Sequence, residues 1–409
     1  MLYEFWQNFI HNLFKPLLLF FYFGFLIPIL KVRFEIPYVV YQGLTMYLLI
    51  AIGWHGGEEL AEINPASIAS IVGFMVVGFL LNFAIGLLAY FLITHLARLR
   101  QIDRATVAGY YGSDSAGTFA TCVAVLTSVA IAFDAYMPVM LAIMEIPGCL
   151  VALYLVARLR ARGMDPAGNM PGERGYTAAA LVGDGPGTAC QPALGQSLEA
   201  PREHKTESER DHSLQTRKHP ESTPSTGDTL PIHGPATTLR EVLLNPGLCL
   251  LIGAVIVGVI SGLQGQKVIH DDDTFFVSAF QGVLCLFLLE AGMTASRRLR
   301  DLKSAGLGFI VFGLIAPNLF ATLGILVAHT YAYFTHSEFK PGTYVLFAVL
   351  CGAASYIAVP AVQRLAIPEA SPSLPLAASL GLTFSYNVTV GIPLYIEIAR
   401  IIGQYFPVG

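Results

Sequence analysis

Long apolar blocks alternate with short polar connections along most of the chain. A membrane helix needs about 20 mostly apolar residues to cross the ~30 Å hydrocarbon layer of a bilayer. On that criterion the sequence predicts ten spans, at residues 16–34, 36–53, 66–96, 105–131, 135–157, 241–263, 275–295, 305–330, 342–362 and 375–399. The first two are short, and the third and fourth are candidates for tilted or broken helices.

One segment departs from this pattern. Residues 163–239 contain nine prolines and a single aromatic residue, Tyr176, among many Ser, Thr, Glu, Arg and His. Such a composition cannot bury enough apolar surface to fold alone, so it predicts a disordered hydrophilic linker. The linker divides the chain into a first membrane repeat at 1–162 and a second at 240–409, with five spans each.

The odd number of spans per half means that the second half enters the membrane from the opposite side. Two halves of inverted topology are typical of many secondary transporters. The predicted fold class is therefore an all-α integral membrane protein of two inverted five-helix repeats, with broken helices near the midplane.

Lys and Arg are distributed unequally between the two sets of connections. One set carries thirteen of them and the other four, and the loop at 54–65 on the poorer side holds three glutamates and no basic residue. Because basic residues collect in cytoplasmic loops, we expect both termini outside and the linker in the cytoplasm. This is the topology of a multi-pass protein of a bacterial inner, or plasma, membrane. The basic set is Lys31, Arg33, Arg98, Arg100, Arg104, Arg158, Arg160, Arg162, Arg297, Arg298, Arg300, Lys303 and Arg364.

Composition narrows the function. Charged residues are 13% of the chain, about half the usual share in soluble domains, and the formal net charge of −4 gives no reason to expect nucleic acid. The six cysteines form no CxxC pair and no ligand spacing with histidine, so neither a disulfide framework nor a metal site is predicted. HExxH and GxSxG motifs are also absent. We therefore expect no enzyme and no cofactor. We interpret the N-terminus as a retained part of the first span.

The fourth span contains residues that suit a binding site better than an apolar helix. Residues 109–118 hold three glycines, three hydroxyl side chains and Asp114. Small residues let the backbone unwind, here at Gly112, or let a neighbouring helix approach. A carboxylate within a span costs at least ~2.5 kcal/mol, so it usually faces a cavity or a partner. Asp114 is thus a candidate cation ligand or proton carrier, although bonding to neighbouring hydroxyls would also explain it.

The ninth span is irregular at the equivalent place in the second half. It contains residues 352–356, Gly-Ala-Ala-Ser-Tyr, followed by Pro360. Proline removes a backbone donor, so Pro360 predicts a helix break, and a broken helix that points its N-terminus at the midplane suits an anion. A kink without a ligand is the alternative. Glu145, directly before Ile146-Pro147, is the second candidate cation ligand, whereas Glu290 and Glu397 fit interfacial positions.

Five short motifs occur in a fixed order along the chain. They are Gly112–Thr118, Met144-Glu145-Ile146-Pro147, Glu290-Ala291-Gly292-Met293, Ser355 through Pro368 with Ser371 and Pro372, and Gly391-Ile392-Pro393-Leu394. In their order and spacing the chain resembles the sodium-dependent bicarbonate transporters best known from cyanobacteria. The likeness covers nearly all of the chain outside the linker.

The resemblance implies bicarbonate as the substrate and sodium as the coupling ion. It also implies a homotrimer and a cytoplasmic regulatory protein of the PII type. Its substrate site lies between the broken fourth and ninth spans. By position, that site comprises Ser113, Ser115, Gly117, Thr118, Ala354 and Ser355.

Two positions depart from the cyanobacterial pattern. The second half of the pattern has a serine run that ends in an acid, where this chain has residues 352–356 with Tyr356. Conversely, Asp114 stands at an apolar position of the pattern. The acidic residue therefore lies in the first repeat of this chain rather than in the second. We add Tyr356 to the substrate-binding residues because its phenol can narrow the site or donate a hydrogen bond to an anion.

We therefore expect a secondary transporter that imports a small anion, most plausibly bicarbonate, together with sodium. Transport of another small carboxylate or anion is an alternative. A passive channel is another, although no ring-like repeat of one residue type is evident. A membrane sensor with a partner-binding linker is a third, and the absence of flux would distinguish it.

Overall fold

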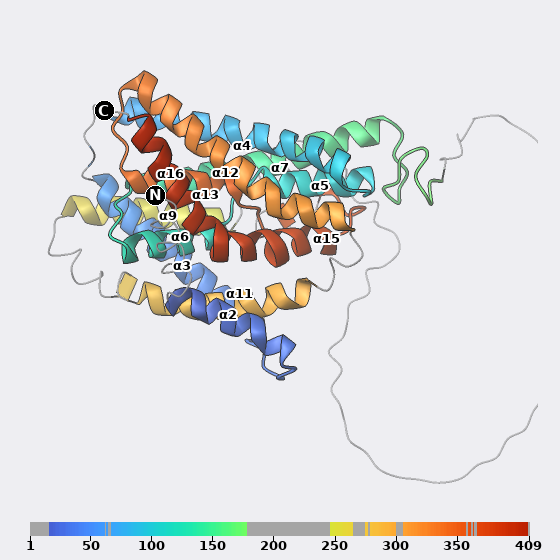
Figure 1. Ribbon diagram of the computed structural model, residues 1–409, viewed down its shortest axis with the longest axis horizontal. Coiled ribbons are helices and arrows are strands. Elements are labelled where there is room, and N and C mark those ends of the chain that lie inside the picture. Colours follow the sequence, from blue (N-terminus) through green and yellow to red (C-terminus); the bar gives the residue numbers. More distant parts are fainter. Residues whose placement is uncertain are drawn as a thin grey trace, which may run out of the picture. The chain divides into compact units, whose positions relative to one another are not determined.

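A computed structural model of the chain describes residues 16–61, 63, 67–177, 246–264, 275–276, 279–299, 306–356, 359–360, 363 and 366–407. Within these ranges the regular secondary structure is helical and no strand occurs, as predicted. Figure 1 shows the arrangement of the helices. They are α2 (Pro16–Ile29), α3 (Tyr38–Ala61), α4 (Ile68–Leu96), α5 (Gln101–Tyr111), α6 (Ala116–Ser128), α7 (Met137–Ala161), α9 (Pro246–Gln264), α11 (Phe280–Arg298), α12 (Leu307–Thr335), α13 (Pro341–Gly352), α15 (Ser373–Leu376), η4 (Ala377–Phe384), η5 (Asn387–Gly391) and α16 (Ile392–Tyr405).

Three helices in the described part of the chain, α4, α7 and α12, are long and apolar enough to cross a membrane. Helices α2 and α13 and residues 249–264 are apolar but shorter. Each predicted span coincides with one helix or with successive helical pieces: the fourth corresponds to α5 and α6, and the tenth to the run from α15 to α16. The count of ten crossings and the inverted repeat remain predictions.

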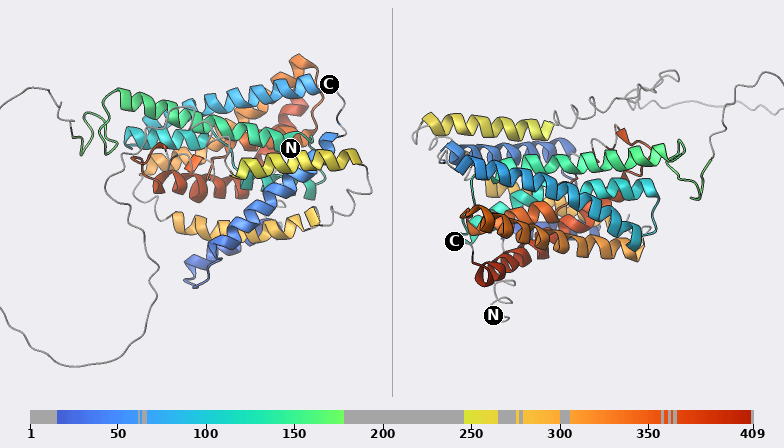
Figure 2. Two further views of the ribbon diagram at one scale, coloured as in Figure 1. Left: turned by 180° about the vertical axis from the view of Figure 1, so that it is seen from behind. Right: turned by 90° about the horizontal axis from the view of Figure 1, so that it is seen from above.

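Small residues allow two pairs of helices to approach closely. Helix α3 packs along α9 (blue and yellow in Figure 2), and α2 packs along α11 (Figure 1). A Cβ at Gly57 or Gly258 would collide with the facing backbone of the α3–α9 pair, and a Cβ at Gly24 would do so with Leu289 of α11. Contact through glycine is a common way for membrane helices to associate. The remaining helices pack around the interrupted pair α5 and α6, with α4 and α7 against α5 and α12 against α13.

The last span widens into π-helix. Helix α15 continues through η4, and η5 follows after two residues, before α16 resumes the α-helix. π-helical turns are rare in proteins, and those that occur are often found at functional sites. No sequence signal predicted them here.

Residues 162–177 form an ordered loop at the C-terminal end of α7, although we predicted a disordered linker from 163 onwards. The carboxylate of Asp165 accepts hydrogen bonds from the backbone N–H groups of Ala167, Asn169 and Thr177 at 2.7–3.0 Å. Glu173 accepts a hydrogen bond from the N–H of Gln101, the first residue of α5, at 2.9 Å. The start of the linker is thus attached to the broken span. Residues 178–245 lie outside the described part, so the predicted disorder of the rest is not tested.

Candidate anion- and cation-binding site

The interruption between α5 and α6 is built from glycine contacts. Gly112 caps the C-terminus of α5, and a Cβ there would lie 2.9 Å from the Cα of Gly86 in α4 and 3.3 Å from the Cα of Gly148 in α7. The chain therefore leaves the helix where only glycine lets three backbones meet. Residues 113–115 are extended or bent, and α6 restarts at Ala116.

One side chain from α4 and one from the interruption itself bond to α7. Pro147 lies inside α7, where it removes one backbone hydrogen bond and loosens the turn before it. The carbonyl of Met144 accepts from Asn82 Nδ2 at 2.9 Å, and the carbonyl of Glu145 accepts from Ser113 Oγ at 2.8 Å. The predicted site residue Ser113 thus links the first break to α7.

Asp114 is the most unusual side chain of the site. It is 1% exposed, and neither carboxylate oxygen has a hydrogen-bond partner among the described residues. The carboxyl groups of Asp114 and Glu145 are close enough to interact electrostatically, and Glu145 is partly exposed. A buried carboxylate without donors is costly unless a cation or a proton compensates it. The two predicted cation ligands therefore share one region of the structure.

The second interruption follows α13 and meets the first. The chain leaves the helix at Ala353, and the N–H of Ser355 donates to the carbonyl of Tyr110, at the end of α5, at 2.8 Å. The hydroxyl of Ser355 accepts from the N–H of Val359 at 3.4 Å. Pro360 stands just after Val359, among the residues that are helical again. The break therefore precedes Pro360, the residue to which we had assigned it.

The π-helical turns hold the second break in place. Asn387 of η5 donates from Nδ2 to the carbonyl of Gly352 at 2.8 Å, and Tyr395 of α16 donates to Asn387 Oδ1 at 2.7 Å. Thr383 of η4 lies 2.6 Å from the hydroxyl of Tyr111. A helix C-terminus has carbonyls without intrahelical partners, and Asn387 satisfies one of them. Asn387 lies 35 residues from Gly352 in the sequence, so no local pattern indicates this bond.

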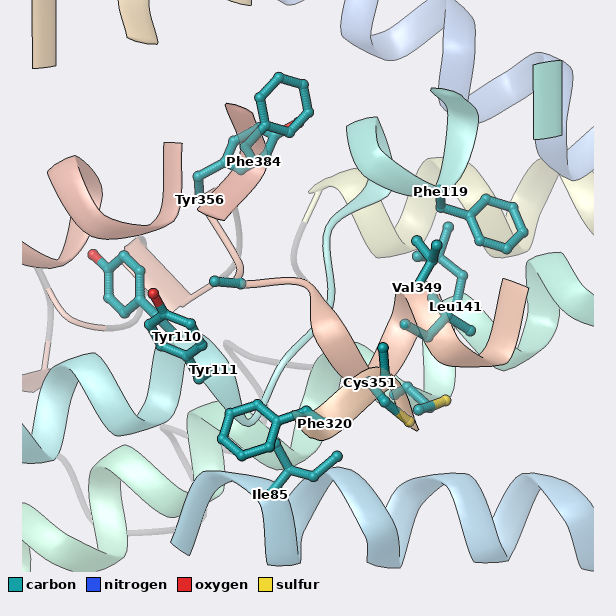
Figure 3. Close-up of a cluster of buried hydrophobic side chains, with 14 of the residues drawn as sticks. Ile85, Tyr110, Tyr111, Phe119, Leu141, Phe320, Val349, Cys351, Tyr356 and Phe384 are labelled. Carbon is teal, nitrogen blue, oxygen red and sulfur yellow. The ribbon is translucent and has the colours of Figure 1, made fainter. Parts of the chain in front are cut away.

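Tyr356 connects the second break to the N-terminus of α6. Its phenol is 9% exposed, and its hydroxyl lies against Gly117, where a Cβ would collide with it. The ring packs edge-on against Phe384 of η4, with centroids 5.5 Å apart. Figure 3 shows Tyr356 beside Phe384, with Tyr110 and Tyr111 at the end of α5 nearby. The side chains of both predicted half-sites therefore converge.

The N-terminus of α6 is capped by a predicted site residue. The hydroxyl of Ser115 accepts from the N–H of Thr118 at 3.3 Å and from its hydroxyl at 2.9 Å. Ala354 is buried in the second break. Among the described residues no group of three or more His, Cys, Asp or Glu side chains could hold a metal ion. Any cation here would use Asp114, Glu145, hydroxyls and backbone carbonyls.

Two cavities lie in succession along α6. The larger, of about 320 Å³, lies near the C-terminal end of α6 and is lined mostly by apolar side chains. Its polar lining residues are His55, Glu59, Thr127 and Gln281. The smaller, of about 10 Å³, shares Ile52 with it and reaches Ala116 and Gly117 at the N-terminal end. The two cavities thus lie at opposite ends of α6, and the smaller one reaches its first turn.

A family model, the Na⁺-dependent bicarbonate transporter superfamily, matches residues 16–400 of the chain. No significant match occurs among curated proteins. The family match spans both interruptions and nearly all described helices. The apolar helices and this match together identify a membrane protein of a transporter family. The chain belongs to the Na⁺-dependent bicarbonate transporter superfamily.

Proposed function

We propose that the protein is a secondary transporter that imports a small anion, bicarbonate first, together with sodium. The observation that carries the proposal is the meeting of two helix breaks beside a carboxylate that has no partner in the described structure. Backbone N–H groups at the N-terminus of α6 suit an anion, and Asp114 suits a cation. The family match supports the same pair of solutes.

The substrate-binding residues in this proposal are Ser113, Ser115, Gly117, Thr118, Ala354, Ser355 and Tyr356. Asp114 and Glu145 form the cation site. Binding of both solutes would order the breaks, and one helix group would then move against the other. The closely packed pairs α2–α11 and α3–α9 are one candidate group, and the helices around α5 and α6 are the other.

The proposal includes further expectations about the assembly. We infer two inverted repeats of five spans, a homotrimer in the bacterial plasma membrane, a cytoplasmic linker with both termini outside, and regulation by a PII-type protein. The family resemblance supports the trimer and the regulator. The Lys and Arg distribution supports the orientation.

Uptake of labelled bicarbonate into proteoliposomes tests the central claim. Wild type and Asp114→Asn are compared with and without an inward sodium gradient. We expect sodium-dependent uptake by wild type and a loss of at least about tenfold in the variant, because removing a charge-assisted ligand costs ~1.5–3 kcal/mol. Glu397→Gln is the matched control, since Glu397 is also buried but forms an ion pair with Arg400 at 2.7 Å.

Each departure from this result has a defined meaning. Equal uptake with and without the sodium gradient, and in wild type and Asp114→Asn, would contradict coupling to sodium and favour a uniporter or channel. Folded protein without bicarbonate flux would contradict the substrate assignment, and a parallel assay with other small carboxylates would then identify the anion.

A further inference from the structure

The first turn of α6 has donors that lack an acceptor in their own helix. The first four N–H groups of any α-helix have no intrahelical partner. Ser115 satisfies one of them, the N–H of Thr118, and its carbonyl accepts from Phe119 at 2.9 Å. The N–H groups of Ala116 and Gly117 therefore remain for another acceptor. Helix α6 has 13 residues, long enough for its dipole to favour an anion at this end.

The phenol of Tyr356 reaches this turn from the second break. Its hydroxyl lies against Gly117 and within reach of the Ser115 hydroxyl and the Gly117 amide. It forms no hydrogen bond of good geometry with any described residue. A buried hydroxyl without a partner usually costs ~1–3 kcal/mol. Its position beside the Gly117 amide is the place where a ligand oxygen would meet the same donors.

Little space remains at the first turn of α6. The cavity that reaches Ala116 and Gly117 measures about 10 Å³ and is otherwise lined by Thr45, Leu48, Leu49, Ile52 and Phe287. That is room for at most one water molecule. The Tyr356 hydroxyl and the Phe287 ring both stand within 3 Å of the position that a Cβ of Gly117 would take. An anion oxygen could therefore take this place at Gly117 only by displacing the hydroxyl.

We propose that Tyr356 occupies the anion site of the empty protein and limits the substrate to planar anions of the size of bicarbonate, formate or nitrate. The inference rests on the proposed function and names its substrate class. The phenol oxygen takes the place of an anion oxygen at the first turn of α6. The ring, packed on Phe384, moves only far enough to admit a flat, small anion.

Larger carboxylates are excluded because the ring stays in their way. Phe384 itself packs against Phe21 of α2, with centroids 6.0 Å apart. The Tyr356 ring is therefore supported from behind by two further aromatic rings. Lactate and pyruvate have two more non-hydrogen atoms than bicarbonate and would collide with the ring. The size selectivity thus depends on Tyr356, a residue that departs from the cyanobacterial pattern.

Competition assays with Tyr356→Ser test the size limit. Proteoliposomes take up labelled bicarbonate in the presence of unlabelled formate, lactate or pyruvate. In wild type we expect formate to compete and lactate and pyruvate to compete poorly. In Tyr356→Ser we expect lactate and pyruvate to inhibit at concentrations at least about tenfold lower, as steric discrimination at a pocket is typically worth 10–200-fold.

Two control variants separate the ring from general damage. Tyr356→Phe keeps the ring and should retain the wild-type size limit, while the loss of its oxygen should lower the KM for bicarbonate. Tyr136→Ser removes another buried tyrosine, at the start of α7, and should leave the selectivity unchanged. Unchanged exclusion of lactate and pyruvate in Tyr356→Ser, with bicarbonate uptake intact, would overturn this inference and leave the proposed function standing. Absence of bicarbonate flux in wild type would instead contradict the proposed function.

A second pair of variants decides the matter if Tyr356→Ser does not fold. Gly117→Ala places a methyl group where the hydroxyl lies, so it should reduce uptake severalfold. Both variants are made with Phe287→Leu, because the Phe287 ring also lies within 3 Å of the new methyl group. Adding Tyr356→Phe, which lacks the colliding oxygen, should restore part of the loss. Equal loss with and without Tyr356→Phe would show that the hydroxyl does not occupy this position.

Discussion

Single hydroxyl and amide side chains hold the backbone where the two spans are interrupted. Ser113 bonds to α7, Ser115 caps α6, and Asn387 caps α13. In hydrocarbon, backbone groups outside a helix must find partners within the protein. The irregular segments are therefore stable only because specific side chains replace the missing helical bonds.

Ser115→Ala should weaken α6 at its first turn. The variant removes the acceptor for the N–H and the hydroxyl of Thr118, and loss of an N-cap costs ~0.5–2 kcal/mol. The midpoint of unfolding in detergent should fall. Thr330→Ala is the control, because its hydroxyl bonds back to its own helix. An unchanged midpoint would contradict the capping role.

The residues of the first break are readable from sequence, and those that fix the second break are not. Three glycines, hydroxyls and one acid in a membrane span predict an interruption near Gly112, and α5 ends there. We predicted the second break at Pro360, but the helix ends earlier, at Gly352. The chain turns at Ala353 because Asn387 and Tyr110 supply partners to Gly352 and Ser355, and such distant pairs leave no local pattern.

At the scale of elements, the π-helical turns connect the last span to both breaks. Thr383 contacts Tyr111 near the end of α5, and Asn387 bonds to the end of α13. A π-helical turn contains more residues than an α-helical turn. In a regular α-helix these side chains would therefore point in other directions. The sequence shows no proline, glycine or charge pattern that predicts such widening, since its cause is tertiary.

Asn387→Leu should loosen the end of α13. The carbonyl of Gly352 and the hydroxyl of Tyr395 would both lose their partner, at ~1–3 kcal/mol for each buried group. Hydrogen exchange of the amides in α13 should accelerate and bicarbonate uptake should fall. Asn318→Leu, which removes a bond to Tyr386, should affect α13 less. Equal exchange in both variants would argue against this role of η5.

At the scale of the whole molecule, a hydrogen-bonded chain runs from the ordered loop to the site. Arg100 donates to the carbonyl of Ala167 and to Asp103, and Asp103 accepts from the N–H of Ser371. Ser371 accepts from Gln363, which accepts in turn from Tyr110. Both broken spans are thus tied together at the end where the linker begins, and no part of this was predicted from composition.

Asp165 should make the order of this loop depend on pH. Backbone N–H groups, that of Asn169 foremost, hold the pKa of its carboxyl below the usual range. The interactions that lower this pKa stabilise the loop fully at pH values above the ordinary aspartate pKa of about 3.9. That stabilisation is lost as the pH falls through the lowered pKa. The protection factors of residues 165–177, which are their exchange rates corrected for the intrinsic effect of pH, should therefore be high at neutral pH and low in strong acid.

Asp165→Asn tests the same loop at neutral pH. The amide cannot accept as many N–H bonds as the carboxylate, so the loop should exchange quickly at pH 7 as well. Glu338→Gln, an exposed change near the end of α12, serves as the control. Slow exchange in Asp165→Asn would show that the carboxylate does not organise the loop.

The buried carboxylate of Asp114 also has an electrical consequence. A unit charge that crosses the whole membrane field changes in energy by about 2.3 kcal/mol per 100 mV. On the proposed cycle the empty site carries the charge of Asp114, and the loaded site carries the same net charge, because one bound sodium ion and one bound anion cancel. A cycle that moves one of each would therefore be electroneutral, and an electric current during import would show that more sodium ions than anions cross.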